Sequence, residues 1–194
     1  MQNKAIIAGL DEVGRGPWAG PIIACAYIEI TEVTHLKITD SKKMNQAQRE
    51  LAYDQLIISG HYGLGAAEAH EIDELGLLKA NQLAFKRAIQ ALPIKPDLIL
   101  IDGRDRTSDD TTLNIPHKSF IRGDSLHKVI SCASIIAKVT RDRLMTDYAQ
   151  IYPKYHFDDH KGYGTRAHIN AIKKHGACPI HRLSFRPVVQ QSLF

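Results

Sequence analysis

Residues 5–30 read AIIAGLDEVGRGPWAGPIIACAYIEI. Two short apolar runs, 5–10 and 21–30, flank a turn that is rich in glycine and proline, and this pattern predicts two consecutive strands joined as a hairpin. Two carboxylates, Asp11 and Glu12, follow the first run directly. A side chain at the end of a buried strand can emerge from the core into a cleft, so the end of this strand is the first candidate for a functional site.

The chain after residue 30 predicts helices and further strands. Asn45 and Gln48 resemble a capping box at the start of a helix over 45–58, and a strand is expected over 62–67. The later elements expected are a helix from about 77 to 92, a strand over 97–101, a loop rich in Ser, Thr and Asp, and helices over 125–148 and 165–175, the last ended by Gly176.

Strands therefore gather early in the chain and helices late. This order predicts an α/β domain in which helices flank a mixed sheet, with a helical, basic C-terminal part over about 145–194. The 194 residues, 44% of them hydrophobic, suit one domain with one core. No apolar run reaches the roughly 20 residues that cross a bilayer, and residues 1–10 lack a secretion signal, so the cytoplasm is expected. Three widely spaced cysteines favour reduced thiols.

The positive charge is concentrated near the C-terminus. The net charge is +4, and six Lys or Arg residues but no Asp or Glu follow Asp159, which leaves residues 1–159 at −2 with 19 basic and 21 acidic side chains. A basic segment beside a slightly acidic body suits a polyanionic partner such as a nucleic acid. The alternative is a basic tail that serves solubility.

Acidic residues stand at three places where a strand ends or a helix starts. Besides Asp11 and Glu12, Asp102 follows the apolar run 98–101, and Asp124 precedes a helix that Ser125 opens. Clustered carboxylates repel each other unless a cation holds them, and their hard oxygen atoms suit Mg²⁺ or Mn²⁺ and phosphate chemistry. Glu12 shares a site with Asp11 only if the strand is already ending there. The alternative is that these acids are turn and cap residues.

Two other kinds of site are compatible with short motifs. Residues 14–19 match the dinucleotide-binding turn G-x-G-x-x-A, but that motif needs a helix directly afterwards, and 22–28 predict a strand. His175, Cys178 and His181 have the spacing of metal ligands, which is a weak zinc signal, and ordinary surface histidines are favoured. The chain contains no phosphate-loop motif with Lys followed by Ser or Thr, and no Gly-x-Ser-x-Gly.

Six blocks occur in an order that is similar to a known family. They are DEVGRGP at 11–17, DSKKM at 40–44, IDG at 101–103, GDS at 123–125, ASIIAKVTRD at 133–142 and HKGYGT at 160–165. Together they closely resemble the bacterial type 2 ribonucleases H (ribonuclease HII), and the resemblance runs from about Gly9 to Pro187.

The resemblance implies a fold, an activity and a metal. The expected fold is RNase H-like, with a mixed five-stranded sheet, and the expected activity is endonucleolytic cleavage of the RNA strand of RNA–DNA hybrids. It also implies a nick on the 5′ side of single ribonucleotides in duplex DNA, which leaves 3′-hydroxyl and 5′-phosphate ends through attack by metal-activated water. The implied ligands of catalytic Mg²⁺ or Mn²⁺ are Asp11, Glu12, Asp102 and Asp124.

The resemblance also implies how the substrate is bound. Only the 2′-hydroxyl separates RNA from DNA at a given position, and Gly14, Arg15 and Gly16 are expected to contact the ribonucleotide while Tyr163 packs on the next deoxyribose. The expected phosphate-binding residues are Lys42, Lys43, Lys161 and Arg166. The alternatives are a tight turn, a core aromatic and solvated surface charges. Trp18 stands where the family commonly has a smaller aliphatic residue, which predicts a change in the shape of the cleft.

The C-terminus carries a short motif of its own. It resembles the peptide by which bacterial proteins dock on the DNA sliding clamp, with Gln191 in place of the usual Leu, and consists of Gln190, Gln191, Ser192, Leu193 and Phe194. A clamp is therefore a candidate partner besides RNA–DNA hybrid and ribonucleotide-containing duplex DNA. No obligate protein partner is indicated and a monomer is expected. The non-enzymatic alternative is a module that binds hybrids through its basic C-terminus without cutting them.

Overall fold

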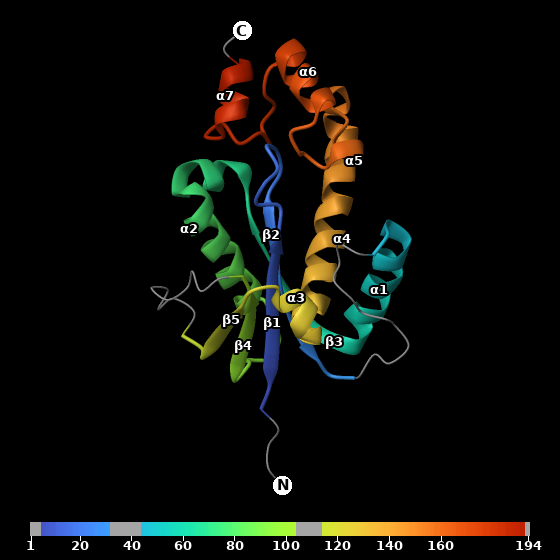
Figure 1. Ribbon diagram of the computed structural model, residues 1–194, viewed down its shortest axis with the longest axis vertical. Helices are drawn as coiled ribbons and strands as arrows, with labels where there is room; N and C mark the ends of the chain where they lie inside the picture. The colour runs from blue at the N-terminus through green and yellow to red at the C-terminus, as the bar shows by residue number, and fades with distance from the viewer. Residues whose placement is uncertain (1–4, 32–43, 104–113, 193–194) are drawn as a thin grey trace.

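The computed structural model describes residues 5–31, 44–103 and 114–192 and places a sheet between helices (Figure 1). Its elements in chain order are β1 (Ile7–Val13), β2 (Ile22–Glu29), α1 (Gln46–Ser59), β3 (Gly60–Ala67), α2 (Ala69–Gln90), β4 (Leu98–Asp102), β5 (His117–Phe120), α3 (Gly123–Leu126), α4 (Lys128–Ile151), a 3₁₀ turn (Pro153–Tyr155), α5 (Phe157–His160), α6 (Arg166–His175) and α7 (Arg186–Ser192).

The sheet is mixed and five-stranded, in the order β3-β2-β1-β4-β5. β1 pairs antiparallel with β2, and β2 pairs antiparallel with β3, whereas β4 runs parallel to both β1 and β5. The predicted hairpin and the expected α/β class are confirmed. Because β2 is a strand, the dinucleotide-binding interpretation of the preceding turn is wrong: that motif needs a helix N-terminus at this place.

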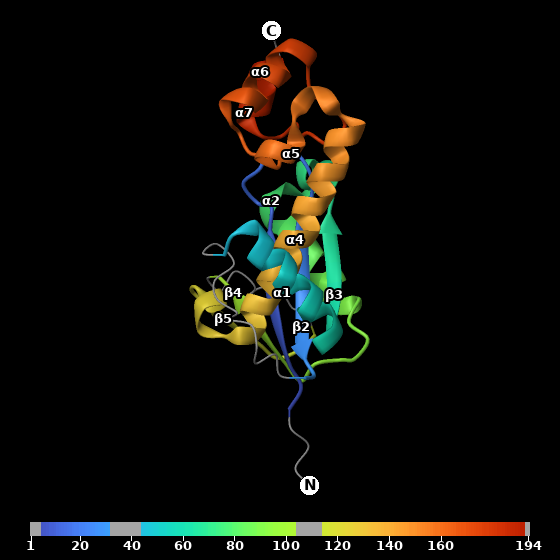
Figure 2. The same cartoon turned by 90° about the vertical axis from the view of Figure 1, so that its right-hand side faces the viewer.

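Two helical layers cover the two faces of the sheet (Figures 1 and 2). Alternate residues of a strand point to opposite faces, so Ala8 and Leu10 of β1 join the core beneath α2. Gly9 lies on the face that α4 covers, where a Cβ would be 2.2 Å from the carbonyl carbon of Val129. The lack of a side chain at Gly9 therefore lets the start of α4 lie directly on the central strand.

Three elements differ from the sequence expectation. α2 begins at Ala69 rather than near 77, and it continues through a kink at Gly76, whose backbone (φ 76°, ψ 159°) is not helical. β5 was not predicted, because its sequence HKSF lacks an apolar pattern. The helix expected over 125–148 is two helices, α3 and α4, because His127 between them adopts an extended conformation.

The C-terminal helices form a cap on one end of the molecule, beyond the sheet (Figure 2). Thr165 caps α6 by accepting a hydrogen bond from the backbone N–H of His168, and the helix ends at Gly176, as predicted. A separate apolar cluster holds this cap together and includes Met145 from α4, Phe157 and Ile172. Across the described ranges, no helix is both long and apolar enough to cross a membrane.

Replacing Gly9 with alanine tests the close approach of α4 to β1. The new methyl group would overlap the backbone of Val129, so we expect the free energy of unfolding, measured by urea denaturation, to fall by about 1–3 kcal/mol. Gly16→Ala is the matched control, because its Cβ would lie 3.8 Å from the nearest atom, in Tyr163. Equal stability of the two variants would show that the packing at Gly9 is looser than described.

Candidate active site

The acids at the end of the first run lie where β1 loses one of its two neighbours. β1 pairs with β2 as far as Val13, but its pairing with β4 ends at Leu10. The condition that the strand is already ending at Glu12 is met, because β1 ends one residue later at Val13 and has already lost its pairing with β4. Asp11 and Asp102 are the next residues on the two parallel strands, so these acids lie side by side at an open edge.

Asp11 and Glu12 point to opposite faces of β1 and still border one cleft. Asp11 is on the α4 side, where the Ser134 hydroxyl bonds to its carboxylate. This cleft, here called the carboxylate cleft, has a volume of about 480 Å³ and is lined by Asp11, Glu12, Val13, Gly14, Arg15, Gly16, Arg49, Asp102, Ser134, Lys138 and Tyr163. Glu12 and Asp102 also border a smaller cavity of about 170 Å³ on the α2 side.

Burial and mutual repulsion destabilise the charged form of the acids in the carboxylate cleft. Asp11 is 5% exposed, and burial raises the pKa of its carboxyl group well above the usual value, with further increases from the charges of Glu12 and Asp102. Burial also raises the pKa of Glu12, although Arg15 Nη1 lies 3.3 Å from Glu12 Oε1 and partly offsets this effect. A cation in the cleft would offset both the cost of burying the charged carboxylates and the repulsion between them.

Asp102 and Asp124 are linked through the residue between them in space, Gly123. The backbone N–H of Gly123 donates to Asp102 Oδ1 at 2.7 Å, and Asp124 follows in the first turn of α3 with 3% exposure. Ser131 of α4 donates to the backbone carbonyl of Asp124. The side chain of Asp124 is not part of the lining of the carboxylate cleft, so three of the four predicted acids line this cleft and the fourth is buried in α3.

The donor set fits a hydrated divalent cation. In the described part of the chain no three His, Cys, Asp or Glu side chains form a ready-made cage for a metal ion. Mg²⁺ needs no such cage, because it keeps several waters and is commonly held by one or two carboxylates together with substrate phosphates. The smaller cavity is also lined by Asn81 and Ser119, and neither Asn81 Oδ1 nor Ser119 Oγ has a hydrogen-bond partner among the residues that the structure describes. These oxygens suit waters around such an ion.

The predicted substrate residues divide into three groups. Gly14, Arg15, Gly16 and Tyr163 all line the carboxylate cleft, and Tyr163 is 43% exposed. Lys161 is not part of the lining of this cleft, and its ammonium group donates to Thr146 Oγ1 at 2.9 Å and to the backbone carbonyl of Asp158 at 2.7 Å. Arg166 is exposed at the start of α6. Two other predicted residues lie outside the described ranges, namely Lys42 and Lys43.

Several cleft residues were missed from the sequence. Ser134 and Lys138 of α4 line the cleft, and Lys138 Nζ forms an ion pair with Asp142 at 2.7 Å. Both belong to the block ASIIAKVTRD, with Arg141 three residues further on. A spacing of four and then three residues places side chains on one face of a helix, so helical periodicity within that block could have found them. Arg49 also lines the cleft, but it lies on α1, outside that block, so the periodicity of the block gives no indication of it.

Trp18 does not line the carboxylate cleft itself, so any effect on the shape of the cleft would pass through its neighbours. Its ring packs against the C-terminal cap, with its centroid 5.8 Å from that of His168. A Cβ on Gly164 would lie 2.2 Å from the indole, so this glycine makes room for the large ring. The bulk of Trp18 therefore fills space between the turn and the cap.

His181 and Cys178 belong to a hydrogen-bonded chain rather than to a zinc site. His168 Nδ1 lies 2.9 Å from the carbonyl oxygen of Tyr163, and His168 Nε2 lies 3.0 Å from His181 Nε2. The backbone N–H of Cys178 donates to His181 Nδ1 at 2.9 Å. These bonds are satisfied together when His168 is protonated on Nδ1 and His181 on Nε2, so both nitrogens of each neutral ring are used. The third residue of the motif, His175, is exposed.

Comparison with known proteins gives a consistent family. A sequence profile described as Ribonuclease HII matches residues 8–188. Ribonuclease HII of Bacillus licheniformis is 47% identical over 183 residues, which cover 94% of this chain and 70% of that protein. Ribonuclease HII of Thermotoga maritima is 42% identical over 185 residues, which cover 95% and 75%.

Solved structures show the same fold. The crystal structure of ribonuclease H2 from Pyrococcus horikoshii matches with a TM-score of 0.80 and 26% identity over 96% of this chain and 97% of that one. The ribonuclease HII in a PCNA complex from Archaeoglobus fulgidus matches with a TM-score of 0.80 over 93% and 95% of the two chains. Its 20% identity supports the fold alone.

Removing the buried charge of Asp11 tests the electrostatics of the carboxylate cleft. A carboxyl whose pKa is raised in the folded state binds more protons there than in the unfolded chain, so stability falls as pH rises from the ordinary carboxyl pKa toward the raised one. At pH 7 with chelator, Asp11→Asn should therefore raise the free energy of unfolding by roughly 1–3 kcal/mol. Mg²⁺ or Mn²⁺ should stabilise the wild type more than this variant.

Thermal and urea unfolding, with and without the metal, measure both effects. Asp147→Asn removes an exposed acid of α4 and is the matched control. It should change neither the stability in chelator nor the stabilisation by the metal. A less stable Asp11→Asn protein in chelator would contradict the idea that these acids repel one another.

Acidification should break the histidine chain. Burial lowers the pKa values of His168 and His181 to about 4 from the ordinary 6.5. Between these values the unfolded chain binds protons that the folded protein does not, so this contribution to stability is complete above pH 6.5 and is lost as pH falls toward 4. The free energy of unfolding, measured by urea at pH 7 and pH 5, should fall by roughly 1–3 kcal/mol more in the wild type than in His168→Gln. An equal change in the free energy of unfolding of the two proteins would show that the two histidines take up protons in the folded protein as easily as in the unfolded chain.

Proposed function

The chain belongs to the ribonuclease HII family, and on that premise we propose how its residues bind and cut the substrate. Ribonucleases HII are metal-dependent hydrolases of phosphodiester bonds, and this chain cleaves the RNA strand of RNA–DNA hybrids. The roles of single residues, the preferred substrate and the metal are the proposal. The observation that carries it is the carboxylate cleft, in which one buried and two partly buried acids lie beside a glycine-rich turn.

The preferred substrate is duplex DNA with a ribonucleotide in one strand, cut on the 5′ side to leave 3′-hydroxyl and 5′-phosphate ends. Gly14, Arg15 and Gly16 approach the sugar, and their lack of bulk at two positions lets backbone come close to the 2′-hydroxyl. Tyr163 offers an exposed ring beside Gly16, in the same cleft, for the next deoxyribose. The acids then lie where the phosphate beside that sugar reaches the open edge of β1.

The metal is Mg²⁺ or Mn²⁺, held by Asp11, Glu12, Asp102 and Asp124. Bound to these oxygens, such an ion would supply activation of the attacking water and stabilisation of the leaving oxygen. The chain supplies the oxygen ligands, and Ser134 orients the Asp11 carboxylate through a hydrogen bond. Arg15 already neutralises part of the charge of Glu12, and its guanidinium can exchange that partner for a substrate phosphate.

Phosphates away from the cut bond contact the basic C-terminal cap and the lysines of 40–44. Lys42, Lys43, Lys161 and Arg166 take this role, in which they fix the register of the duplex without reading its sequence. Lys161 would have to release Thr146 to reach a phosphate. The charge distribution of the sequence supports this arrangement, because the C-terminal basic residues follow Asp159 without an intervening acid.

The sliding clamp stays a candidate partner. The Archaeoglobus fulgidus ribonuclease HII has been seen in a complex with PCNA, and the C-terminal motif of this chain supports an analogous contact. α7 includes Gln190 through Ser192, whereas Leu193 and Phe194 lie outside the described ranges. A clamp contact at that end leaves the cleft open to the duplex. A monomer in the cytoplasm is the simplest setting for this function.

Cleavage of a labelled duplex with one ribonucleotide tests the proposal. We expect a nick on its 5′ side in Mg²⁺ or Mn²⁺, none with chelator, and a 3′ end that a DNA polymerase extends. Asp11→Asn should reduce the rate by at least about 100-fold, because a lost metal ligand removes several kcal/mol of transition-state stabilisation. An all-DNA duplex of the same sequence is the control and should stay intact. Cleavage of hybrids without any nick at the single ribonucleotide would overturn the proposed preference while leaving the family activity in place.

A further inference from the structure

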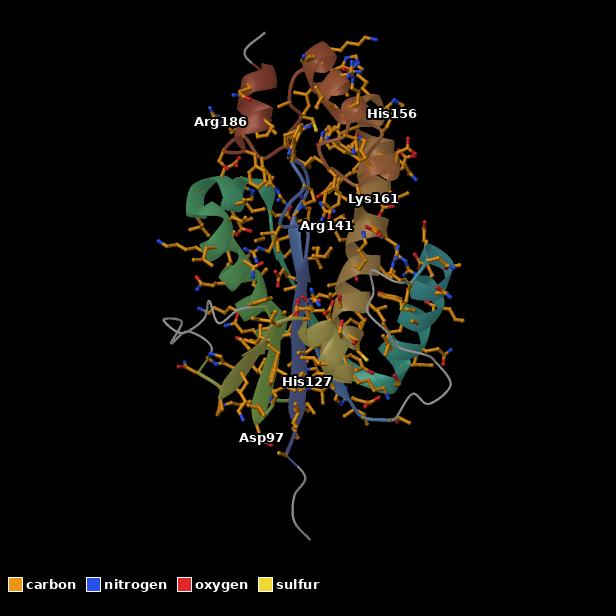
Figure 3. All side chains as sticks on the ribbon, in the orientation of Figure 1. Asp97, His127, Arg141, His156, Lys161 and Arg186 are labelled. Atoms are coloured by element: carbon orange, nitrogen blue, oxygen red, sulfur yellow. The ribbon has the colours of Figure 1, made fainter. Side chains whose placement is uncertain are left out.

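Two arginines that take no part in the proposed chemistry are buried behind the turn between β1 and β2. Arg141 of α4 lies between that helix and the hairpin (Figure 3), and Arg182 follows α6; both are 0% exposed. Burial lowers the pKa of Arg141 to about 10 and that of Arg182 to about 9, so both guanidinium groups remain charged at neutral pH. Two buried positive charges need strong acceptors.

Arg182 finds its acceptors in the backbone of the turn. Its Nη1 donates to the carbonyl oxygen of Arg15 at 3.0 Å, and its Nη2 donates to that of Gly14. Nε and Nη2 also donate to the carbonyl oxygen of Gly20, at 3.0 and 2.7 Å. One guanidinium group therefore binds both ends of the turn at the same time.

Arg141 binds the same turn from the other side. Nε donates to the carbonyl oxygen of Pro21 and Nη2 to that of Ala19, both at 3.0 Å. Nη1 donates to the carbonyl oxygen of Lys161 in the C-terminal cap, at 2.9 Å. Gly14 (φ 95°) permits this approach, because a Cβ there would lie 2.3 Å from Arg141 Nε. Within the described residues neither arginine forms an ion pair.

The direction of these carbonyl groups fixes the direction of the amides that follow them. In a planar trans peptide the C=O of one residue and the N–H of the next point in opposite directions. The carbonyls of Gly14 and Arg15 point to Arg182, so the N–H groups of Arg15 and Gly16 point away from it. Both residues line the carboxylate cleft, and within the described part of the chain neither N–H donates to another protein group.

We propose that Arg141 and Arg182 are positioning residues for ribose recognition: they hold the turn so that the amides of Arg15 and Gly16 face the cleft and donate to the ribonucleotide 2′-hydroxyl oxygen. This inference rests on the proposed function of the turn. A lysine cannot replace either arginine in this role, because an ammonium group is a compact point charge without the planar fork that reaches several carbonyls at once.

The test compares binding with and without the one hydroxyl group. Duplexes of identical sequence, with one ribonucleotide or with none, are titrated in Ca²⁺, where binding is measured apart from cleavage. Arg182→Lys and Arg141→Lys keep the charge and should reduce the preference for the ribonucleotide duplex about tenfold, the size of a lost hydrogen-bond contribution. The affinity for the all-DNA duplex should stay within about twofold.

Arg87→Lys is the matched control. Arg87 also bonds a backbone carbonyl, that of Ala66, and pairs with Glu71, but it joins α2 to β3 and does not line the cleft. We expect the Arg87→Lys variant to prefer the ribonucleotide duplex over the all-DNA duplex as strongly as the wild type does. An equal loss of affinity for both duplexes in the arginine variants would mean a general structural role and would overturn the inference, as would an unchanged preference. A wild type with no preference would instead refute the proposed reading of the turn.

A measurement on the wild type covers the case in which both lysine variants fail to fold. In amide NMR spectra in Ca²⁺, the Gly16 and Arg15 signals should shift with the ribonucleotide duplex and differ from their positions with the all-DNA duplex. Identical shifts with the two duplexes would show that these amides donate to a phosphate or to water, and would overturn the inference.

Discussion

β1 pairs with β2 over a longer stretch than it pairs with β4, and the geometry of the site depends on this difference. Pairing to β2 keeps Asp11 and Glu12 in a regular strand, while the end of pairing with β4 leaves them without a neighbour on that side. Strand alternation then directs the two carboxylates to opposite faces, with Asp102 at the end of the adjacent strand. Because the backbone is fixed by hydrogen bonds, the acids cannot move apart to relieve their repulsion.

The two buried arginines, Arg141 and Arg182, do not neutralise the acids, because they are engaged elsewhere. Arg141 and Arg182 bond backbone carbonyls, and their charges are satisfied by peptide dipoles instead of by the carboxylates. An arginine paired with Asp11 would lower the pKa of that carboxyl and fill the place of a metal ion. Arg15 is the partial exception, but its contact with Glu12 at 3.3 Å is long and its side chain is 32% exposed, so Glu12 is a partner that it can exchange.

Local signals in the sequence were sufficient for elements that stabilise themselves. The capping box at Asn45 and the Thr165 cap both occur where the sequence placed them, and the acids were identified because each follows an apolar run or a glycine. β5 carries no such pattern, since its pairing with β4 decides its conformation. Arg141 and Arg182 would be assigned to the surface by residue type, and their carbonyl partners in the turn lie 120 to 168 positions away in the sequence. Contacts between residues so far apart in the chain cannot be recognised from a local sequence pattern.

The long helix α4 contacts both the acids of the cleft and the turn between β1 and β2. One of its faces carries Ser134, which bonds Asp11, and Arg141, which holds the turn. A helix rises 1.5 Å per residue, so these two contact points are fixed about 10 Å apart along a rigid element. The start of the same helix is seated on Gly9 of the central strand. One helix therefore holds both Asp11 and the turn that we propose to read the ribose, so the loops of the cleft do not have to set their relative position.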